Sequence, residues 1–256
     1  MSPRERITGV IRAAAALGEP ALVAYLTAGF PSRARFRDHL RALAAASDIV
    51  EVGVPFTDPM ADGVTIQRAS LAALAQGVSL AWILEEIAAL GAIGTPVLLM
   101  SYLNPLLSFG LARLAEAAAR AGVSGIIVPD LPLDESGELR SALDEPQLAL
   151  VQMVTPVTGP QRLGQLCAAS GGFVYAVTMT GTTGRNVAVP AAVLDYLDRV
   201  RVASPLPVCA GFGIRSREQV ERLGGHVDGV VVGSARVEVL ERGEDAGTFL
   251  RGLRTG

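Results

Sequence analysis

The fold follows from one stretch of the chain, Ile49-Val-Glu-Val-Gly-Val-Pro-Phe-Thr-Asp-Pro-Met-Ala-Asp-Gly63. It begins with a short β-branched run, Ile49–Val52, passes through a loop rich in proline and glycine, and leads into a helical pattern from Thr65. This order is typical of a buried parallel strand followed by a helix. Because similar units recur from one end of the chain to the other, we expect a repeated βα architecture.

Eight such units are predicted. The strands are expected at Ala21–Leu26, Ile49–Val52, Val97–Met100, Gly125–Val128, Ala149–Met153, Phe173–Thr178, Leu206–Cys209 and Gly229–Val232. The helices are expected at Arg33–Ala46, Thr65–Leu90 with a break at Gly77, Leu111–Ala121, Ser136–Leu143, Gln161–Ala169, Val193–Val200, Arg217–Leu223 and Val237–Arg242. Apolar strands separated by helices indicate a parallel sheet that helices cover.

Eight is the number of strands that closes a barrel. We therefore predict an α/β fold, a (β/α)₈ TIM barrel, with an extra N-terminal helix at Pro3–Leu17 that caps the barrel bottom. An open, doubly wound sheet is the competing arrangement. No low-complexity linker and no shift in composition divides the chain, so residues 1–256 are expected to form a single barrel domain.

The composition favours a large buried core and excludes several classes of partner. Half of the 256 residues are hydrophobic and 18% are charged. A net charge of −3 and a pI near 5.5 provide no basic surface for nucleic acid. No apolar run has the length that a bilayer requires, and the N-terminal residues lack the pattern of a signal peptide. We expect a cytoplasmic protein.

Nucleophile and metal chemistry are restricted by the same composition. Cys167 and Cys209 are far apart and are read as buried small hydrophobic residues. His39 and His226 have no carboxylate or cysteine at metal-ligand spacing, so no metal site is expected. All 22 Lys+Arg positions are arginine, which excludes a lysine Schiff base and covalent attachment of pyridoxal phosphate to this chain.

Glu51 is the first candidate catalytic residue. Strand alternation places Ile49, Glu51 and Gly53 on one face and valines on the other. Since valines suit the helix layer, Glu51 should point into the barrel near its top, where desolvation would raise its pKa. Such a carboxyl suits a general acid or base. A structural ion pair and a solvated rim position are the alternatives.

Asp62 is the second candidate, in the loop that follows the same strand. It precedes the helix expected from Thr65, so ordinary helix N-capping is the alternative to a catalytic role. Active sites of TIM barrels lie on the loops after the strands' C-terminal ends. Two carboxyl groups on one such loop therefore form a candidate acid–base pair.

Glycine-rich segments follow the last three predicted strands. They are Thr180-Gly-Thr-Thr-Gly-Arg185, Ala210-Gly-Phe-Gly-Ile-Arg-Ser216 and Gly233-Ser-Ala235. Glycines let a phosphate approach the backbone, and helix N-termini favour anions, although tight turns also use glycine. In barrels this end commonly binds phosphate. The segment from 180 to 190 lacks helical periodicity and is predicted to form a lid, with a disordered connector as the alternative.

A family resemblance rests on these motifs. Glu51 to Gly63 resembles the tryptophan synthase alpha subunit signature E-[LIV]-G-[VI]-P-[FY]-[ST]-D-P-x-A-D-G. Further segments are similar to family motifs in the same order, namely Met100-Ser-Tyr-x-Asn-Pro105, Gly211-Phe-Gly-Ile214 and Val232-Gly-Ser-Ala235. The chain departs from the family at Thr182, where valine is usual, and at Tyr25, where phenylalanine is common.

The resemblance implies a role for each matching residue. Glu51 would transfer protons and Asp62 would bind the indole N–H. The residues implied to contact the substrate phosphate are Gly184, Gly213, Gly233 and Ser234. The indole pocket would be lined by Tyr25, Leu99, Ile127 and Tyr175, with Thr183 as the lid threonine that meets Asp62.

The implied activity is that of a carbon–carbon lyase, a retro-aldol cleavage of indole-3-glycerol phosphate to indole and glyceraldehyde 3-phosphate in tryptophan biosynthesis. The implied partner is a pyridoxal-phosphate beta subunit in an αββα heterotetramer, and the cofactor would belong to that partner. The residues that match the family's contact surface are Asp58, Pro59, Asn104, Pro105, Asp130 and Pro132. Proline-rich loops without a partner are the alternative for them.

For the function of the whole chain, three alternatives remain. They are another phosphate-handling barrel enzyme, a free-standing indole-releasing lyase of secondary metabolism, and a non-catalytic activating subunit.

Overall fold

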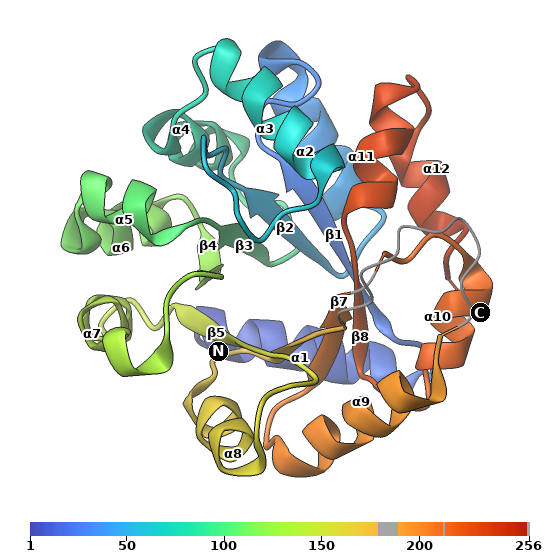
Figure 1. Ribbon diagram of the computed structural model, residues 1–256. Helices are drawn as coiled ribbons and strands as arrows, with labels where there is room; N and C mark the ends of the chain where they lie inside the picture. The colour runs from blue at the N-terminus through green and yellow to red at the C-terminus, as the bar shows by residue number, and fades with distance from the viewer. Residues whose placement is uncertain (179–188, 212, 255–256) are drawn as a thin grey trace.

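The computed structural model describes residues 1–178, 189–211 and 213–254. Its centre is a closed barrel in which β1 to β8 follow one another in chain order and β8 pairs with β1 (Figure 1). The strands are β1 Ala21–Thr27, β2 Ile49–Gly53, β3 Val97–Met100, β4 Val123–Ile127, β5 Ala149–Val154, β6 Val174–Val177, β7 Val208–Gly211 and β8 Gly229–Val232. All eight pairings are parallel, which confirms the predicted barrel and excludes the open sheet.

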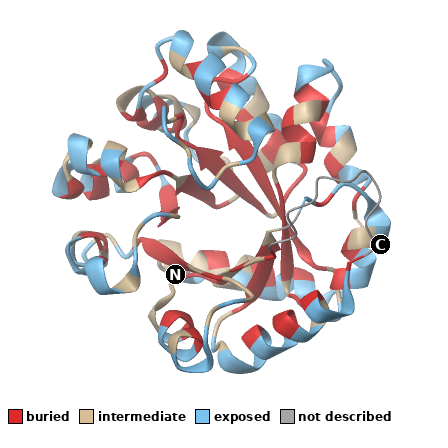
Figure 2. Cartoon of the chain, in the orientation of Figure 1, coloured by how far each residue is buried: buried red, intermediate tan, exposed pale blue. Residues whose placement is uncertain are grey.

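Helices surround the barrel. They are α1 Pro3–Ala16, α2 Phe36–Ala44, α3 Val64–Ala75, α4 Leu80–Leu90, α5 Leu103–Phe109, α6 Leu111–Arg120, α7 Gly137–Asp144, α8 Pro160–Ala169, α9 Ala191–Ala203, α10 Arg217–Leu223, α11 Ser234–Glu241 and α12 Ala246–Arg251. Two 3₁₀ turns, Arg33–Arg35 and Leu133–Glu135, precede α2 and α7. Figure 2 shows that the strands are buried, whereas the helices are buried on the side facing the barrel.

Two apolar layers hold the barrel together. Alternate strand residues such as Val50 and Val52 pack outward in a large cluster between strands and helices. Their neighbours pack in a separate cluster inside the barrel, and Ile7 and Ile11 of α1 belong to that inner cluster. Ser2 starts α1 with a capping box to Glu5. Because Ile7 and Ile11 pack inside the barrel, helix α1 closes its N-terminal end, as predicted.

The helical stretch predicted at Thr65–Leu90 forms two helices, α3 and α4, and the predicted break at Gly77 is confirmed; its φ of 74° suits glycine. Several other predicted boundaries were wrong. Helix α11 begins at Ser234, three residues before the prediction, and β7 is shifted toward Gly211. The short α5 and α12 were missed, because six or seven residues carry too little periodicity to distinguish a helix from a loop.

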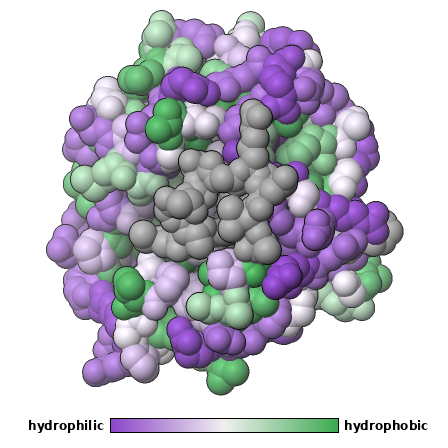
Figure 3. All heavy atoms as spheres, turned by 45° about the vertical axis from the view of Figure 1, so that its right-hand side comes forward, coloured by the Kyte–Doolittle hydropathy of each residue, from purple (hydrophilic) through white to green (hydrophobic). Residues whose placement is uncertain are grey.

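The surface is mixed in character. On the face shown in Figure 3, hydrophilic residues prevail among the coloured, described residues, and hydrophobic ones are scattered between them. Within the described ranges no single helix is long and apolar enough to cross a bilayer. Only α3 and α4 taken together, bent by 89° at their break, pass that test of length and composition.

Candidate active site

Glu51 lies inside the barrel near the C-terminal end of β2. Ile49, on the same face of β2, packs in the inner cluster. Glu51 itself is 1% exposed. Among the described residues, its Oε2 atom is buried without a hydrogen-bond partner. Burial first, and the charge of Asp62 second, raise the pKa of Glu51 to about 8. Burial therefore excludes the solvated rim position considered for Glu51, and the described residues form no ion pair with it. With this pKa the carboxyl of Glu51 is protonated near neutral pH.

Asp62 lies in the loop after β2 and is half-buried. The N-cap of α3 is Gly63 and makes no side-chain cap, so Asp62 does not have the capping role considered from the sequence. Its backbone carbonyl accepts a hydrogen bond from Gln67 Nε2 at 2.8 Å. Burial raises the pKa of Asp62 to about 6, while a hydrogen bond from the Tyr102 side chain opposes that rise. Asp62 is thus ionised at pH 7 while Glu51 is protonated.

Tyr102 is a site residue to which the sequence analysis assigned no role. It precedes α5, and its hydroxyl accepts a hydrogen bond from the backbone N–H of Ala61 at 2.9 Å. Its ring stacks on Phe56 with centroids 5.2 Å apart. Tyr102 therefore contacts the loop after β2 at two points, Phe56 and Ala61. This loop carries Asp62 and is called the acid loop below. The place of Tyr102 within the Met100–Pro105 motif was the signal that could have identified it.

Two tyrosines fill the mouth of the barrel above the inner cluster. Thr27 Oγ1 donates a hydrogen bond to Tyr25 Oη at 3.2 Å. A Cβ atom at Gly53 would overlap the Tyr25 ring, and one at Gly211 would overlap Tyr175. Burial raises the pKa of both phenols, so they stay neutral. The two glycines thus make room for two predicted pocket residues.

The predicted pocket is corrected at one position on β3. Leu99 packs in the outer cluster between strands and helices, so its side chain points away from the barrel interior. Its neighbour Met100 instead packs against both the inner cluster and the Tyr25 cluster. The prediction was one residue out of register, and one residue reverses the face in a strand. Ile127 lies in the inner cluster, so its side chain faces the barrel interior.

The described part of the glycine-rich end lies at neighbouring strand ends. Gly213 follows β7, Gly233 is the N-cap of α11, and Ser234 is the first residue of that helix. No side chain of the described residues caps α11, so its first backbone amides can face an anion. Strands β7 and β8 pair directly, which brings these residues to one edge of the barrel. The predicted lid residues Thr183 and Gly184 lie outside the described residues.

Arg236 is a buried charge that the sequence analysis did not identify. It lies in the first turn of α11 and is 0% exposed. Its three guanidinium nitrogens have no hydrogen-bond partner among the described residues. Burial lowers its pKa to about 9, which still leaves it charged at pH 7. Its position within a family-like motif, where a charged side chain follows Gly-Ser-Ala, was the available signal.

The six predicted contact residues lie on three consecutive loops at the same end of the barrel. Asp58 and Pro59 follow β2, Asn104 and Pro105 open α5 after β3, and Asp130 and Pro132 follow β4. Each is exposed or partly exposed. Two hydrogen bonds join these loops, Ala61 N–H to Tyr102 Oη and Leu103 N–H to Asp130 Oδ1 at 2.9 Å each. The three loops therefore form one continuous surface.

Comparisons with known proteins identify the family of the chain. The family model "Tryptophan synthase alpha chain" matches residues 11–251. A tryptophan synthase alpha chain of Nitratidesulfovibrio vulgaris (strain Hildenborough) is 46% identical over 248 residues, with 96% of each chain covered. One of Solidesulfovibrio magneticus is 45% identical over 246 residues, covering 95% of this chain and 96% of the relative.

Solved structures show the same likeness. A structure of Mycobacterium tuberculosis tryptophan synthase superposes with a TM-score of 0.89 at 37% identity, covering 98% of this chain and 99% of that one. A tryptophan synthase alpha chain from Legionella pneumophila superposes with a TM-score of 0.86 at 27% identity, covering 97% and 95%. The chain therefore belongs to the tryptophan synthase alpha chain family.

Proposed function

We propose that this chain cleaves indole-3-glycerol phosphate to indole and glyceraldehyde 3-phosphate. Family membership makes it a lyase with the alpha-subunit role in tryptophan biosynthesis. The observation that carries the specific reaction is the pair of buried Glu51 and half-buried Asp62 at one strand end, with pKa values raised to about 8 and about 6. At neutral pH one carboxyl can donate a proton while the other remains an anion.

The two carboxyl groups divide the chemistry between them. Protonated Glu51 delivers its proton to C3 of the indole, and anionic Asp62 stabilises the positive charge that develops at the indole nitrogen. The glycerol hydroxyl next to the ring then loses its proton to Glu51. The bond between C3 and that carbon breaks, its electron pair returns to the ring, and the carbon becomes the aldehyde of glyceraldehyde 3-phosphate. One proton enters and one leaves, so Glu51 is regenerated.

The remaining predicted residues would bind the two ends of the substrate. Tyr25, Ile127 and Tyr175, with Met100 in the place first assigned to Leu99, supply apolar walls for the indole ring. The phosphate would bind the backbone at Gly213 and Gly233 and the N-terminus of α11 at Ser234, where amides and the helix dipole favour an anion. Gly184 and Thr183 are proposed to complete this cradle.

We propose no cofactor in this chain. It has no lysine, so a lysine Schiff base is unavailable to it, and the indole ring must accept the electrons of the broken bond. Pyridoxal phosphate would belong to a beta subunit in an αββα heterotetramer. The surface formed by the loops after β2, β3 and β4 fits such a partner, because exposed Met60 (85%) stands beside Asp58 and Pro59. The cytoplasm is the proposed location.

The deciding experiment supplies indole-3-glycerol phosphate to the purified chain and measures released indole. The wild type should release indole, whereas Glu51→Gln should release none and still bind inorganic phosphate as the wild type does. An active Glu51→Gln enzyme would overturn the assignment. The names of the matching relatives support the alpha-subunit role over a free-standing lyase or a non-catalytic subunit.

The partnership has its own test. Size-exclusion chromatography of the chain alone and mixed with a beta subunit should show a shift to larger size on mixing, together with faster indole release. No shift would count against association, while leaving the cleavage reaction to be judged by the first assay.

A further inference from the structure

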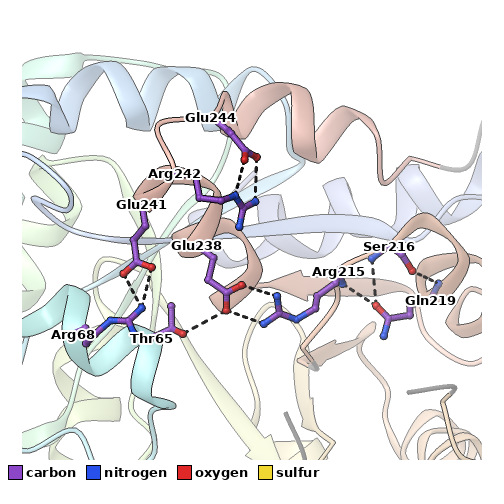
Figure 4. Close-up of polar contacts among 9 residues, drawn as sticks. All are labelled: Thr65, Arg68, Arg215, Ser216, Gln219, Glu238, Glu241, Arg242 and Glu244. Atoms are coloured by element: carbon purple, nitrogen blue, oxygen red, sulfur yellow. Dashed lines mark hydrogen bonds and ion pairs between the residues drawn. The ribbon is translucent and has the colours of Figure 1, made fainter. Parts of the chain in front are cut away.

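The carboxylate of Glu238 connects three separate segments around the site. Arg215 Nη1 donates to Glu238 Oε2 at 2.7 Å, and Arg215 Nη2 donates to Oε1 at 2.8 Å. The hydroxyl of Thr65 donates to Oε1 at 3.5 Å. Figure 4 shows Glu238 between these two partners, which approach it from opposite sides. Paired bonds of the Arg215–Glu238 kind fix orientation as well as distance.

Each segment carries a group of the proposed site. Arg215 comes two residues after Gly213, and Glu238 comes four residues after Ser234 on α11. Thr65 comes three residues after Asp62, at the start of α3. Glu238 therefore connects the loop after β7, the helix after β8 and the first turn of α3, which directly follows the loop that carries Asp62. The first two belong to the phosphate end and the third belongs to the acid end.

The position of Arg215 is itself set by the start of α10. Ser216 begins α10 with a capping box to Gln219. The side-chain oxygen of Gln219 also accepts a hydrogen bond from Arg215 N–H at 2.8 Å. The backbone around Arg215 is thus held by α10 while its guanidinium reaches Glu238, so hydrogen bonds join this loop to α11 and, through Glu238, to α3.

The ion pair stays charged across the neutral range. Its hydrogen bonds raise the pKa of Arg215 and lower that of Glu238. The two side chains are 37% and 27% exposed, so solvent screens the pair and its contribution to global stability is small. Its effect is therefore expected in the geometry of the site rather than in the unfolding of the chain.

We propose that Glu238 is a positioning residue that sets the distance between the phosphate cradle and the Glu51–Asp62 pair. This inference rests on the proposed function, since it requires one substrate that spans both ends. A small misplacement between the ends leaves each end able to bind but lowers the rate of the reaction that needs both. Glu238 would act through Arg215 and Thr65 without touching the substrate.

Glu238→Ala is the test variant and Glu241→Ala is its matched control. Glu241 lies one turn further along α11 and accepts two hydrogen bonds from Arg68 of α3, both at 2.9 Å, without reaching Arg215. Both variants remove one carboxylate from the same helix. Glu238→Ala should lower kcat about tenfold and Glu241→Ala should leave it within about twofold, with both unfolding within a few degrees of the wild type.

A two-ligand measurement separates positioning from simple structural damage. The affinity for indole is measured with and without saturating inorganic phosphate. In the wild type, phosphate should tighten indole binding several-fold. In Glu238→Ala each ligand alone should bind within about twofold of the wild type, but the mutual tightening should disappear. Retention of both kcat and the tightening in Glu238→Ala would overturn the proposal.

Arg215→Met supplies an independent route to the same result. It should reproduce the loss, and the double variant with Glu238→Ala should be no worse than either single variant, because both break one link. Additive losses would contradict a shared link. A wild-type chain that binds both ligands but releases no indole would refute the proposed reaction, whereas an active wild type with an equally active Glu238→Ala would refute only the role of Glu238.

Discussion

The ring of Tyr25 occupies the space that a side chain at Gly53 would need. The two residues lie on neighbouring strands, β1 and β2, and Gly53 comes two residues after Glu51 on the same face. A Cβ atom at Gly53 would meet the Tyr25 hydroxyl and ring well inside van der Waals contact. The absence of a side chain at position 53 therefore leaves the space beside Glu51, the proposed catalytic carboxyl, to the Tyr25 ring.

Gly53→Ala should displace Tyr25 from this place. A shift of about 1 Å in a pocket wall can cost about 100-fold in rate, so we expect a loss of kcat/KM of that order. Steady-state release of indole measures it. Gly164→Ala is the control, since no atom of the described residues beyond the neighbouring stretch of α8 lies within 4 Å of a Cβ atom at that position. Gly164→Ala should keep full activity and raise the free energy of unfolding by about 0.5–1 kcal/mol. Full activity in Gly53→Ala would contradict the steric argument.

The rate of cleavage should have a bell-shaped dependence on pH. Asp62 must lose its proton to stabilise the indole cation, so kcat/KM should rise as pH increases through about 6. Glu51 must keep its proton for indole C3, so kcat/KM should fall as pH increases through about 8. A pH profile of kcat/KM reports these groups in the free enzyme. A profile that is flat between pH 5 and pH 9 would contradict both roles.

The raised pKa of Glu51 also predicts how Glu51→Gln changes stability. The folded chain holds this proton up to about pH 8, whereas the unfolded chain releases it near the ordinary value of 4.5. The wild type should therefore lose free energy of unfolding as pH rises between these values. Glu51→Gln lacks this loss, so its stability relative to the wild type should increase across that window. Parallel stability curves from denaturant titrations at several pH values would refute the shift.

Tyr102→Phe should move the acidic limb of the pH profile upward. The hydroxyl of Tyr102 opposes the rise in the pKa of Asp62, so its removal should place that pKa above 6 and lower the activity below neutral pH. The matched control is Tyr196→Phe, because the hydroxyl of Tyr196 on α9 is buried without a partner among the described residues. Tyr196→Phe should leave the profile unchanged, and an unchanged profile in Tyr102→Phe would rule out the assigned hydrogen bond.

Arg236→Met should stabilise the fold. The guanidinium is fully buried and unpaired within the described residues, so it pays desolvation without a compensating bond. Replacing buried ion pairs by apolar side chains has raised stability by about 1–4 kcal/mol in other proteins, and an unpaired buried charge lacks even the compensating attraction. Thermal unfolding measures the effect. The exposed Arg222 provides the control, and Arg222→Met should stay within about 0.5 kcal/mol of the wild type. Lower stability in Arg236→Met would mean that the native chain supplies Arg236 with a partner.

Much of this protein can be derived from the order of its residues. Eight apolar runs with helical patterns between them are enough for the barrel, because strand and helix periodicities are local properties. The alternation around Glu51 is enough to place that carboxyl inside, and a helix-closed bottom follows from the pattern before Ala21. The absence of lysine excludes Schiff-base chemistry before any fold is known.

Other features depend on contacts between distant segments, so they required the folded chain. A shift of one residue moved the inward-facing position at the end of β3 from Leu99 to Met100, since strand register is set by packing against neighbours. Tyr102 acquires its role from a hydrogen bond with Ala61, which is 41 positions away in the sequence. Glu238 acquires its role in part from a hydrogen bond with Thr65, which is 173 positions away. No local pattern encodes such contacts. Gly53 looked like part of a motif, and only its neighbour on β1 shows why a side chain cannot stand there.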